Sequence, residues 1–271
     1  MAASNQSDDT KLHQMQHDLI SACHILHHHH ILDAFGHISF RHPLKDDVFV
    51  MSRNMAPGTV TSPTDLVEYS IKNAEPLDPA APRGFLERYI HSECYKKHSA
   101  VRSVVHSHSE AVVPYTISGV PLRACFHMAG FLGNKVPVWD IINAQKPDDI
   151  SDLLVRNKRL GASLAAAFGS HGGKEGHPGS NVALMRGHGF TILSTSIQDC
   201  VMKAIYTEKN ATIQTTALLQ RATSPSGSPP ICYLSEKEIH DTTWSIAEAS
   251  HRPWALWLRE VERSEIYENL A

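Results

Sequence analysis

The chain has 271 residues, of which 42% are hydrophobic and 20% are charged, and its formal net charge is -3. This length suffices for one substantial core, and the composition excludes a disordered or collagen-like chain. No apolar run approaches the roughly 18 residues of a membrane span, so we do not expect the chain to cross a membrane. No basic tract favours a nucleic-acid backbone, so we do not expect the protein to bind nucleic acid. Nineteen histidines are unusually many, and they direct attention to a metal or proton-transfer site.

The cysteines and the first residues bear on the cellular compartment. The five cysteines are scattered and odd in number, and no two form a CxxC pair, which argues against a disulfide framework and against a cysteine-built zinc site. The opening MAASNQSDDTKL has neither the apolar region of a secretory signal nor the arginine-rich pattern of a transit peptide. We therefore expect a reducing compartment and a cytoplasmic location.

The first half of the chain predicts a helix followed by strands. Apolar residues at helical spacing predict an amphipathic helix over residues 9–32. The β-prone segments HISF and VFVM follow at 37–40 and 48–51, and DLVEYSI is a candidate third strand. A helical window covers 85–97, and VRSVVHSH at 101–108 predicts a strand buried on at least one face.

The second half predicts helices around a hairpin. We expect a helix over 150–168, a mobile glycine-rich surface insertion over 170–181, and two short strands around a Gly-His-Gly within 182–193. A long helix over 196–222 and a linker over 224–230 follow, and Ser235 with Glu238 forms the capping box of a last helix. The alternation of elements predicts an α/β fold around one core with a C-terminal helical appendage.

Two histidine motifs are candidates for a metal site. His106 and His108 are two apart on the predicted strand, so both side chains emerge on one face about 7 Å apart, close enough to share an ion. Their alternative role is that of solvated strand residues. His188 stands between two glycines that allow a close backbone approach, which makes it a plausible third ligand, although a simple turn residue has the same pattern.

Glu87 opens the predicted helix 85–97, with His91 one turn later on the same face and Tyr95 beyond it. A carboxylate in this place can move protons beside a metal. The alternative is that Glu87 only complements the helix dipole. The run His27 to His30 points around the circumference of the first helix, and we expect it to be a solvated surface feature.

Taken together, these motifs resemble the class II aldolase/adducin family. The resemblance rests on Gly36-His37-Ile38-Ser39, on the helix bearing Glu87, on AVRSVVHSHS and on LMRGHGFTIL, and it covers about residues 15–220. It implies a three-layer α/β/α sandwich around a largely antiparallel sheet for residues 1–222. Residues 223–271 would be a linker and a helical segment packed on the same domain or on a neighbouring subunit.

The resemblance also implies a chemistry. One divalent ion per subunit would bind His106, His108 and His188, with zinc expected first and manganese or iron as alternatives, and Glu87 would be the catalytic acid/base. The protein would be a homotetramer with active sites between subunits, acting on a small molecule. Adducin shares the fold without the metal histidines, and their presence here argues against a non-catalytic binding module.

Departures from the family pattern concern the substrate. Members that act on sugar phosphates have small hydroxyl residues before the catalytic glutamate and an asparagine after the first glycine. Here Phe85, Leu86 and His37 take these places. Bulky apolar groups donate no hydrogen bonds to a phosphate, so we expect an unphosphorylated, aromatic or polyoxygenated hydroxy-carboxylic acid.

Longer segments resemble a decarboxylase-like subgroup that includes 3,4-dihydroxyphthalate decarboxylases. They are FGHISFRHP, FVMSRNMAPG and FHMAGFLGNKVPVWDI. The expected activity is metal-dependent cleavage of a carbon-carbon bond, with decarboxylation preferred; retro-aldol cleavage and a non-heme iron oxygenase activity are alternatives. The expected substrate-binding residues are His37, Ser39, Arg41, Arg53 and His127, and His91 and Tyr95 are expected to support the site.

Overall fold

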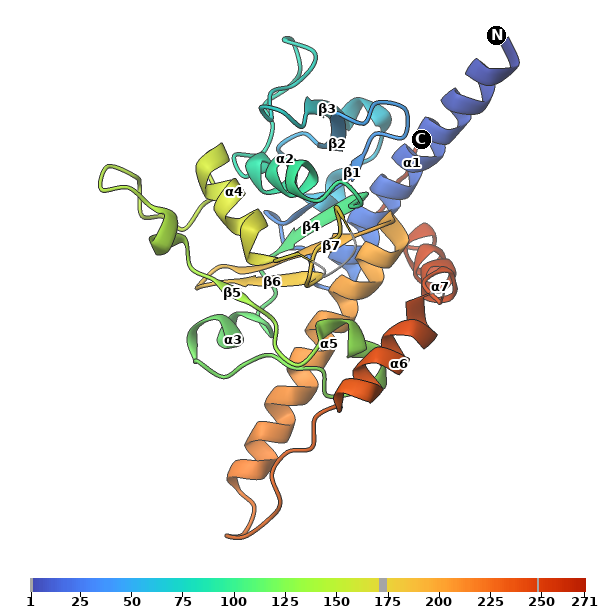
Figure 1. Ribbon diagram of the computed structural model, residues 1–271. Coiled ribbons are helices and arrows are strands. Elements are labelled where there is room, and N and C mark those ends of the chain that lie inside the picture. The colour runs from blue at the N-terminus through green and yellow to red at the C-terminus, as the bar shows by residue number, and fades with distance from the viewer. Residues whose placement is uncertain (1, 171–174, 248) are drawn as a thin grey trace.

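A computed structural model describes residues 2–170, 175–247 and 249–271, and Figure 1 shows how they are arranged. Part of the predicted surface insertion at 170–181 therefore lies outside the described residues. No helix in the described ranges is long and apolar enough to cross a membrane.

A seven-stranded sheet forms the centre of the described chain. Its strands are β1 (His37–Arg41), β2 (Val48–Ser52), β3 (Leu66–Ser70), β4 (Ser103–Ser107), β5 (Val138–Trp139), β6 (Val182–Met185) and β7 (Gly189–Ser194). They lie in the order β3-β2-β1-β4-β7-β6-β5, and β5 with β6 is the one parallel pair among the strands described. The prediction of an α/β fold with a largely antiparallel sheet is confirmed.

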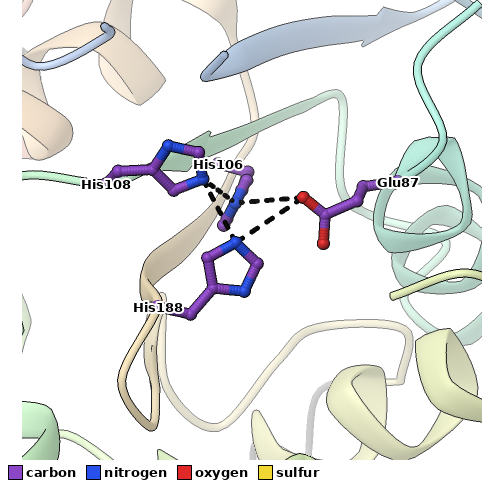
Figure 2. A group of neighbouring side chains, drawn as sticks. All are labelled: Glu87, His106, His108 and His188. Atoms are coloured by element: carbon purple, nitrogen blue, oxygen red, sulfur yellow. Dashed lines mark hydrogen bonds and ion pairs between the residues drawn. The ribbon is translucent and has the colours of Figure 1, made fainter. Parts of the chain in front are cut away.

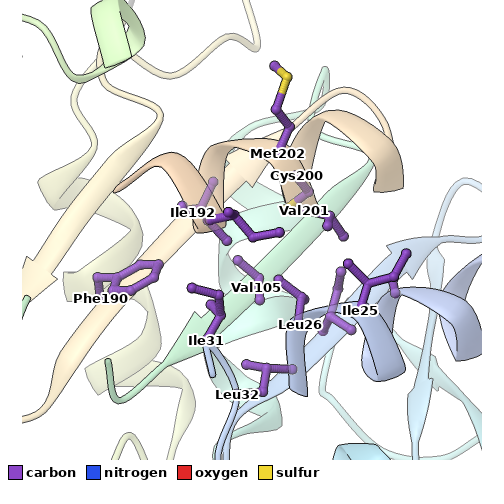
Figure 3. Packing of buried hydrophobic residues seen from close by; sticks show 14 of the residues in the cluster. Ile25, Leu26, Ile31, Leu32, Val105, Phe190, Ile192, Cys200, Val201 and Met202 are labelled. Atoms are coloured by element: carbon purple, nitrogen blue, oxygen red, sulfur yellow. The ribbon is translucent and has the colours of Figure 1, made fainter. Parts of the chain in front are cut away.

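Helices cover both faces of this sheet. On one face lie α1 (Ala2–His28), α5 (Ile197–Ala222) and α7 (His251–Glu262), and on the other lie α2 (Arg88–Lys97) and α4 (Lys158–Ala167) (Figure 1). Neighbouring strand residues contribute to the two cores alternately. Val105 packs with α1 and α5 (Figure 3). Val104 packs beneath α2 and α4. The three-layer sandwich is thus confirmed.

The remaining helical elements are short or peripheral. They are α3 (Val113–Ile117), α6 (Glu236–Ala247) and the 3-10 turns η1 (Pro57–Thr59), η2 (Pro63–Asp65), η3 (His127–Leu132) and η4 (Ile141–Ala144). The predicted capping box is present at the start of α6, where the Glu238 carboxylate accepts from the Ser235 backbone N–H at 2.7 Å. The prediction of a single last helix was wrong, because a second helix, α7, follows and buries Trp254 and Trp257.

The first helix is shorter at its C-terminus than predicted. It ends at His28, because His30 adopts a left-handed φ of 58° and the N–H groups of Ile31 and Leu32 both bond back to the Leu26 carbonyl. This turn directs Ile31 and Leu32 into the core (Figure 3).

The predicted helix over 150–168 begins only at Lys158, where the Asn157 side chain caps the Leu160 N–H. Residues before it follow an irregular path in which Leu153 has a φ of 66°. The N–H of Val155 is bonded to the Glu87 carboxylate and is therefore not available for a helical bond. The helical prediction for 150–157 was wrong for this reason.

The C-terminal segment packs along α1. The Asn269 side chain donates to the His17 carbonyl and to Ser21 Oγ at 2.9 Å, and the Leu270 N–H donates to the Thr61 carbonyl at 2.8 Å. Part of the histidine run takes part in this packing. His27 Nδ1 lies 2.8 Å from the Tyr267 hydroxyl, so this histidine is not merely solvated as expected. The division of the chain at residue 222 stays a prediction.

Candidate metal centre and active site

Three histidine rings converge at the ends of the central strands β4 and β7 (Figure 2). His106 lies near the end of β4, His108 follows the strand, and His188 lies in the turn between β6 and β7. Nε2 of His108 is 3.1 Å from Nε2 of His106 and 3.1 Å from Nε2 of His188. The pairing of β4 with β7 therefore brings together two motifs that are about 80 residues apart in the sequence.

The glycines beside His188 make this approach sterically feasible. Gly189 has a φ of 153°, and a Cβ atom built on it would lie 2.0 Å from the Ser107 carbonyl oxygen. Gly187 has a left-handed φ of 64°, which closes the tight turn. A larger residue at position 189 would push the turn away from β4 and separate His188 from His108.

Glu87 faces the three rings from the start of α2. Its Oε2 atom lies 3.7 Å from Nε2 of His106 and 3.6 Å from Nε2 of His188 (Figure 2). Its Oε1 atom accepts a hydrogen bond from the Val155 N–H at 2.8 Å. Burial raises the pKa of Glu87 to about 7, against the opposing effect of the Val155 N–H. A carboxyl group with this pKa both gives and takes a proton readily near neutral pH.

The donor atoms suit a divalent ion. One ligand atom from each of Glu87, His106, His108 and His188 can be chosen so that all four lie within 4.8 Å of one another. Tetrahedral zinc places its nitrogen ligands about 3.3 Å apart, close to the spacing of the imidazole nitrogens here. Burial lowers the pKa of His106 well below its usual value and that of His188 to about 4, so both rings are neutral at neutral pH. Neutral imidazole is the form that binds metal.

The Nδ1 atoms of His106 and His108, which point away from the converging Nε2 atoms, form hydrogen bonds with acceptors on the protein. The Nδ1–H of His108 donates to Oδ2 of Asp33 at 3.1 Å, and the Nδ1–H of His106 donates to the Phe190 carbonyl at 3.1 Å. These bonds leave both Nε2 lone pairs directed at the ion site. The Asp33 carboxylate is itself fixed by the N–H groups of Phe35 and Gly36, each at 2.8 Å.

Asp33 is a residue of this site that the sequence motifs do not predict. Its only sequence signal is an aspartate three residues before Gly36, which is typical of an Asx turn and does not by itself indicate a histidine partner.

A cavity of about 570 Å³ opens above Glu87, His108 and His188. Much of its wall is apolar, from Phe35, Pro76, Pro82, Phe85, Leu86 and Leu154. Polar groups that line it besides the site itself are His37, Asn54, Tyr69, Arg83 and Arg88. Such a lining, in which aromatic and aliphatic side chains stand beside hydrogen-bonding groups, suits a small organic molecule with polar substituents.

Arg83 is the notable charge in this lining. Its side chain is exposed, and in the described part of the chain it pairs with no carboxylate. The Arg88 guanidinium, by contrast, is occupied by the carbonyl oxygens of Ala74 and Phe85. The buried Tyr69 hydroxyl has no hydrogen-bond partner among the described residues. Arg83 and Tyr69 were not foreseen, because their place in the cavity depends on the path of the loop before α2.

Some of the predicted substrate-binding residues lie at the cavity and others lie away from it. His37 lines the cavity, and Ser39, His91 and Tyr95 lie buried directly behind it. Arg41 lies four residues beyond His37 on β1, about 13 Å along the strand. Its guanidinium donates to three backbone carbonyls, those of Val101, Asp46 and Tyr95. The structure therefore gives Arg41 a packing role and does not bring it to the cavity.

Two further candidates also lie outside the cavity lining. Arg53 is paired with Asp65 at 2.9 Å, next to the loop that the C-terminal segment contacts. His127 begins η3, which packs against α5 and α6. Within this chain neither side chain reaches the metal centre.

The sequence and the fold were compared with those of known proteins. Residues 17–215 match the family described as the class II aldolase and adducin N-terminal domain. Decarboxylase tropJ of Talaromyces stipitatus is 51% identical over 255 residues, covering 93% of this chain and 96% of that protein. A 3,4-dihydroxyphthalate decarboxylase of Rhodococcus jostii is 23% identical over 238 residues, covering 84% of this chain and 86% of that protein.

Solved structures agree with this assignment at the level of fold. The L-fuculose 1-phosphate aldolase from Glaciozyma antarctica PI12 superposes with a TM-score of 0.72 at 17% identity, covering 96% of this chain and 94% of that one. An aldolase II superfamily protein from Pseudomonas syringae gives a TM-score of 0.69 at 18% identity, covering 93% and 94%. The decarboxylase relatives and the domain match support a lyase. The chain belongs to the class II aldolase and adducin N-terminal domain family.

Proposed function

We propose that the protein is a metal-dependent decarboxylase of an unphosphorylated, aromatic or polyoxygenated hydroxy-carboxylic acid. The observation that carries this proposal is the convergence of Glu87 with His106, His108 and His188 beside a cavity that has aromatic and aliphatic side chains in its wall. A relative that is 51% identical and is named a decarboxylase supports it.

Each part of the site has a role in this reaction. A divalent ion on the three histidines, with zinc expected and manganese or iron as alternatives, would supply Lewis acidity toward negative charge on a substrate oxygen. Glu87 delivers or removes the proton at carbon, since its pKa of about 7 suits both directions. Arg83 provides an unpaired cation on the cavity wall for a carboxylate. It replaces Arg41 and Arg53 as our candidate for that contact.

The apolar wall supports an unphosphorylated substrate. Phe85 is 6% exposed and Leu86 is 38% exposed, and both line the cavity beside Glu87. Placing a phosphate dianion against these side chains would cost several kcal/mol, because they donate no hydrogen bond in place of water. An aromatic ring loses little by the same contact and gains buried apolar area.

The test is a product assay on the metal-loaded protein with dihydroxybenzoates, hydroxyphthalates and small hydroxy acids. We expect release of carbon dioxide from at least one acid, and none from the same acid with the His188→Ala variant. Release of an aldehyde instead would favour retro-aldol cleavage, and oxygen uptake by an iron-loaded form would favour an oxygenase. Efficient cleavage of fuculose phosphate or ribulose phosphate would contradict the substrate class, and a protein that binds no metal would favour a binding module.

The proposal includes a homotetramer in the cytoplasm. Exposed apolar side chains on helices, such as Trp244 at 77% and Ile117 at 64% exposure, support burial in an assembly. The five cysteines are all free, which suits a reducing compartment. Light scattering of the purified protein measures its mass, and a mass of one subunit would contradict the tetramer.

A further inference from the structure

His37 and three side chains behind it form a continuous hydrogen-bonded chain of buried groups that leads from the cavity into the interior. His37 Nδ1 lies 2.7 Å from His91 Nε2, and His91 Nδ1 lies 2.7 Å from Ser39 Oγ. Ser39 Oγ lies 2.8 Å from the Tyr95 hydroxyl. None of the four residues is more than 2% exposed, so water does not compete for these bonds.

The local geometry of two elements produces this alignment. His37 and Ser39 are two apart on β1 and therefore share one face of the sheet. His91 and Tyr95 are four apart on α2 and therefore share one face of the helix, which packs on that side of the sheet. Arg41, on the same face of β1, donates to the Tyr95 carbonyl at 2.6 Å and lies over the Tyr95 ring. The arginine thus fixes the inner end of the chain.

The chain has only one favourable direction. Among the described residues, Ser39 Oγ is the sole acceptor within reach of the Tyr95 O–H, so Tyr95 donates to Ser39. Ser39 then has its own proton free to donate to His91 Nδ1. A neutral imidazole carries one proton, so His91 holds it on Nε2 and donates it to His37 Nδ1. The opposite direction would leave a buried tyrosine O–H without an acceptor, which is costly.

The direction determines what His37 presents to the cavity. With Nδ1 engaged as an acceptor, the proton of a neutral His37 is on Nε2, which has no partner among the described residues. The His37 ring lies 5.2 Å from the ring of the metal-site residue His106 and 4.7 Å from the Phe85 ring, measured between centroids. Burial also lowers the pKa of His91 to about 3 and lowers that of His37, which keeps both rings neutral.

We propose that Tyr95, Ser39 and His91 are positioning residues that hold His37 as an Nε2–H donor to a substrate oxygen beside the metal histidines. This inference rests on the proposed function, and it adds a hydrogen-bond donor that acts where negative charge develops as the carbon-carbon bond breaks. It predicts that His37 selects substrates with an acceptor oxygen at this place, such as a phenolate or a carboxylate.

The first test observes the direction of the chain without turnover. The zinc-loaded protein, labelled with 15N in its histidines, is studied by NMR, and His37 and His91 are assigned from His37→Gln and His91→Gln spectra. We expect both rings to carry their proton on Nε2, with the His91 Nε2–H exchanging slowly with water. A His91 ring protonated on Nδ1 overturns the proposal.

The second test uses kinetics on an acid that the product assay has identified. His37→Phe removes the donor, and we expect kcat to fall roughly ten- to hundredfold with metal content and KM little changed. Ser39→Ala is expected to lower kcat about tenfold. Tyr95→Phe should have a smaller effect than Ser39→Ala, because Ser39 can still donate to His91.

The outcomes separate this proposal from the proposed function. Wild-type kcat in both His37→Phe and Ser39→Ala overturns the positioning role, whatever the reaction is. If no acid is turned over, the proposed function fails. The nitrogen spectrum still determines the direction of the hydrogen bonds from Tyr95 to His37. A variant that loses metal or melts at a much lower temperature reports a structural defect, and in that case the nitrogen spectrum of the wild-type protein decides.

Discussion

The backbone N–H of Val155 donates to Oε1 of Glu87 across 2.8 Å, and this bond connects the loop before α4 with the first residue before α2. One carboxylate oxygen is thereby anchored, while the other faces His106 and His188. An anchored carboxyl group keeps its direction toward the substrate, so it is well placed to transfer a proton rather than to bind the ion permanently.

The first prediction follows from this geometry. Glu87→Gln keeps the size of the side chain and an acceptor for the Val155 N–H but no longer exchanges a proton readily. We expect turnover to fall by about 10²-fold or more with the metal retained. Glu93→Gln is the matched control, because Glu93 is also buried on α2 but does not line the cavity. If the Glu87→Gln variant remains active, a group other than Glu87 transfers the proton.

The second prediction concerns the metal ligands. Alanine at His106, His108 or His188 should reduce the bound metal to a small fraction of one equivalent, as measured by elemental analysis after dialysis, while circular dichroism stays close to that of the wild type. His240→Ala is the control, since that side chain is 82% exposed on α6. Full occupancy in His188→Ala would exclude His188 from the site.

The third prediction concerns Asp33, whose carboxylate holds the Nδ1–H of His108. Asp33→Asn retains the shape of the Asx turn but loses the charge that makes the imidazole a better ligand. We expect the metal dissociation constant to rise about 10- to 100-fold, measured by competition with a chelator. Asp46→Asn should change nothing, because Asp46 is 93% exposed and remote from the metal ligands. Equal affinities for the Asp33 variant and the wild type would leave this carboxylate with a structural role only.

The fourth prediction compares two arginines. Arg83→Met should weaken binding of an aromatic carboxylate roughly ten- to hundredfold, because a charge-assisted hydrogen bond is lost. Arg53→Met should bind the same ligand as the wild type does, since Arg53 is paired with Asp65 and does not line the cavity. Calorimetric titration measures both. If Arg53→Met weakens binding and Arg83→Met does not, Arg53 and not Arg83 contacts the substrate carboxylate.

The fifth prediction uses the buried imidazole of His91. Its pKa is about 3 in the folded protein and about 6.5 when unfolded, so below pH 6.5 the unfolded chain binds a proton that the native state does not. Stability is therefore lost as the pH falls, and by pH 5 this residue alone costs about 2 kcal/mol. Urea unfolding of metal-free protein at pH 7 and pH 5 should show this loss reduced by about that amount in His91→Gln. Parallel pH profiles would contradict the shifted pKa.

Local spacing predicted part of the candidate site, because the geometry of a strand is short-range. The two-residue separation of His106 from His108 predicted that both rings lie on one face, whereas the inclusion of His188 and Glu87 rested on the family resemblance. Arg41 shows the limit of such reasoning. The sequence pattern predicts which face of β1 carries the Arg41 side chain, but it does not predict how far along the strand the cavity extends. In the structure the Arg41 guanidinium donates to three backbone carbonyls and does not reach the cavity.

The contributions of loops were not predictable in this way. Residues 150–157 look helical by composition, yet the Val155 N–H bonds to a carboxylate 68 residues away in the sequence. Arg83 and Asp33 likewise acquire their roles from loop paths that depend on the whole fold. The histidine run of α1 was expected in solvent, but His27 meets Tyr267, 240 residues later in the chain.

Because His108 meets His188 across the β4–β7 pair, an ion bound to both, as proposed, would cross-link distant parts of the chain. An ion that binds only the folded form adds to the free energy of unfolding in proportion to the logarithm of its free concentration, about 2.7 kcal/mol at 100 times the dissociation constant. The melting temperature of the metal-binding protein that we propose would then depend on the free metal concentration of the buffer. Chelators in a purification would lower the melting temperature even when every side chain is intact.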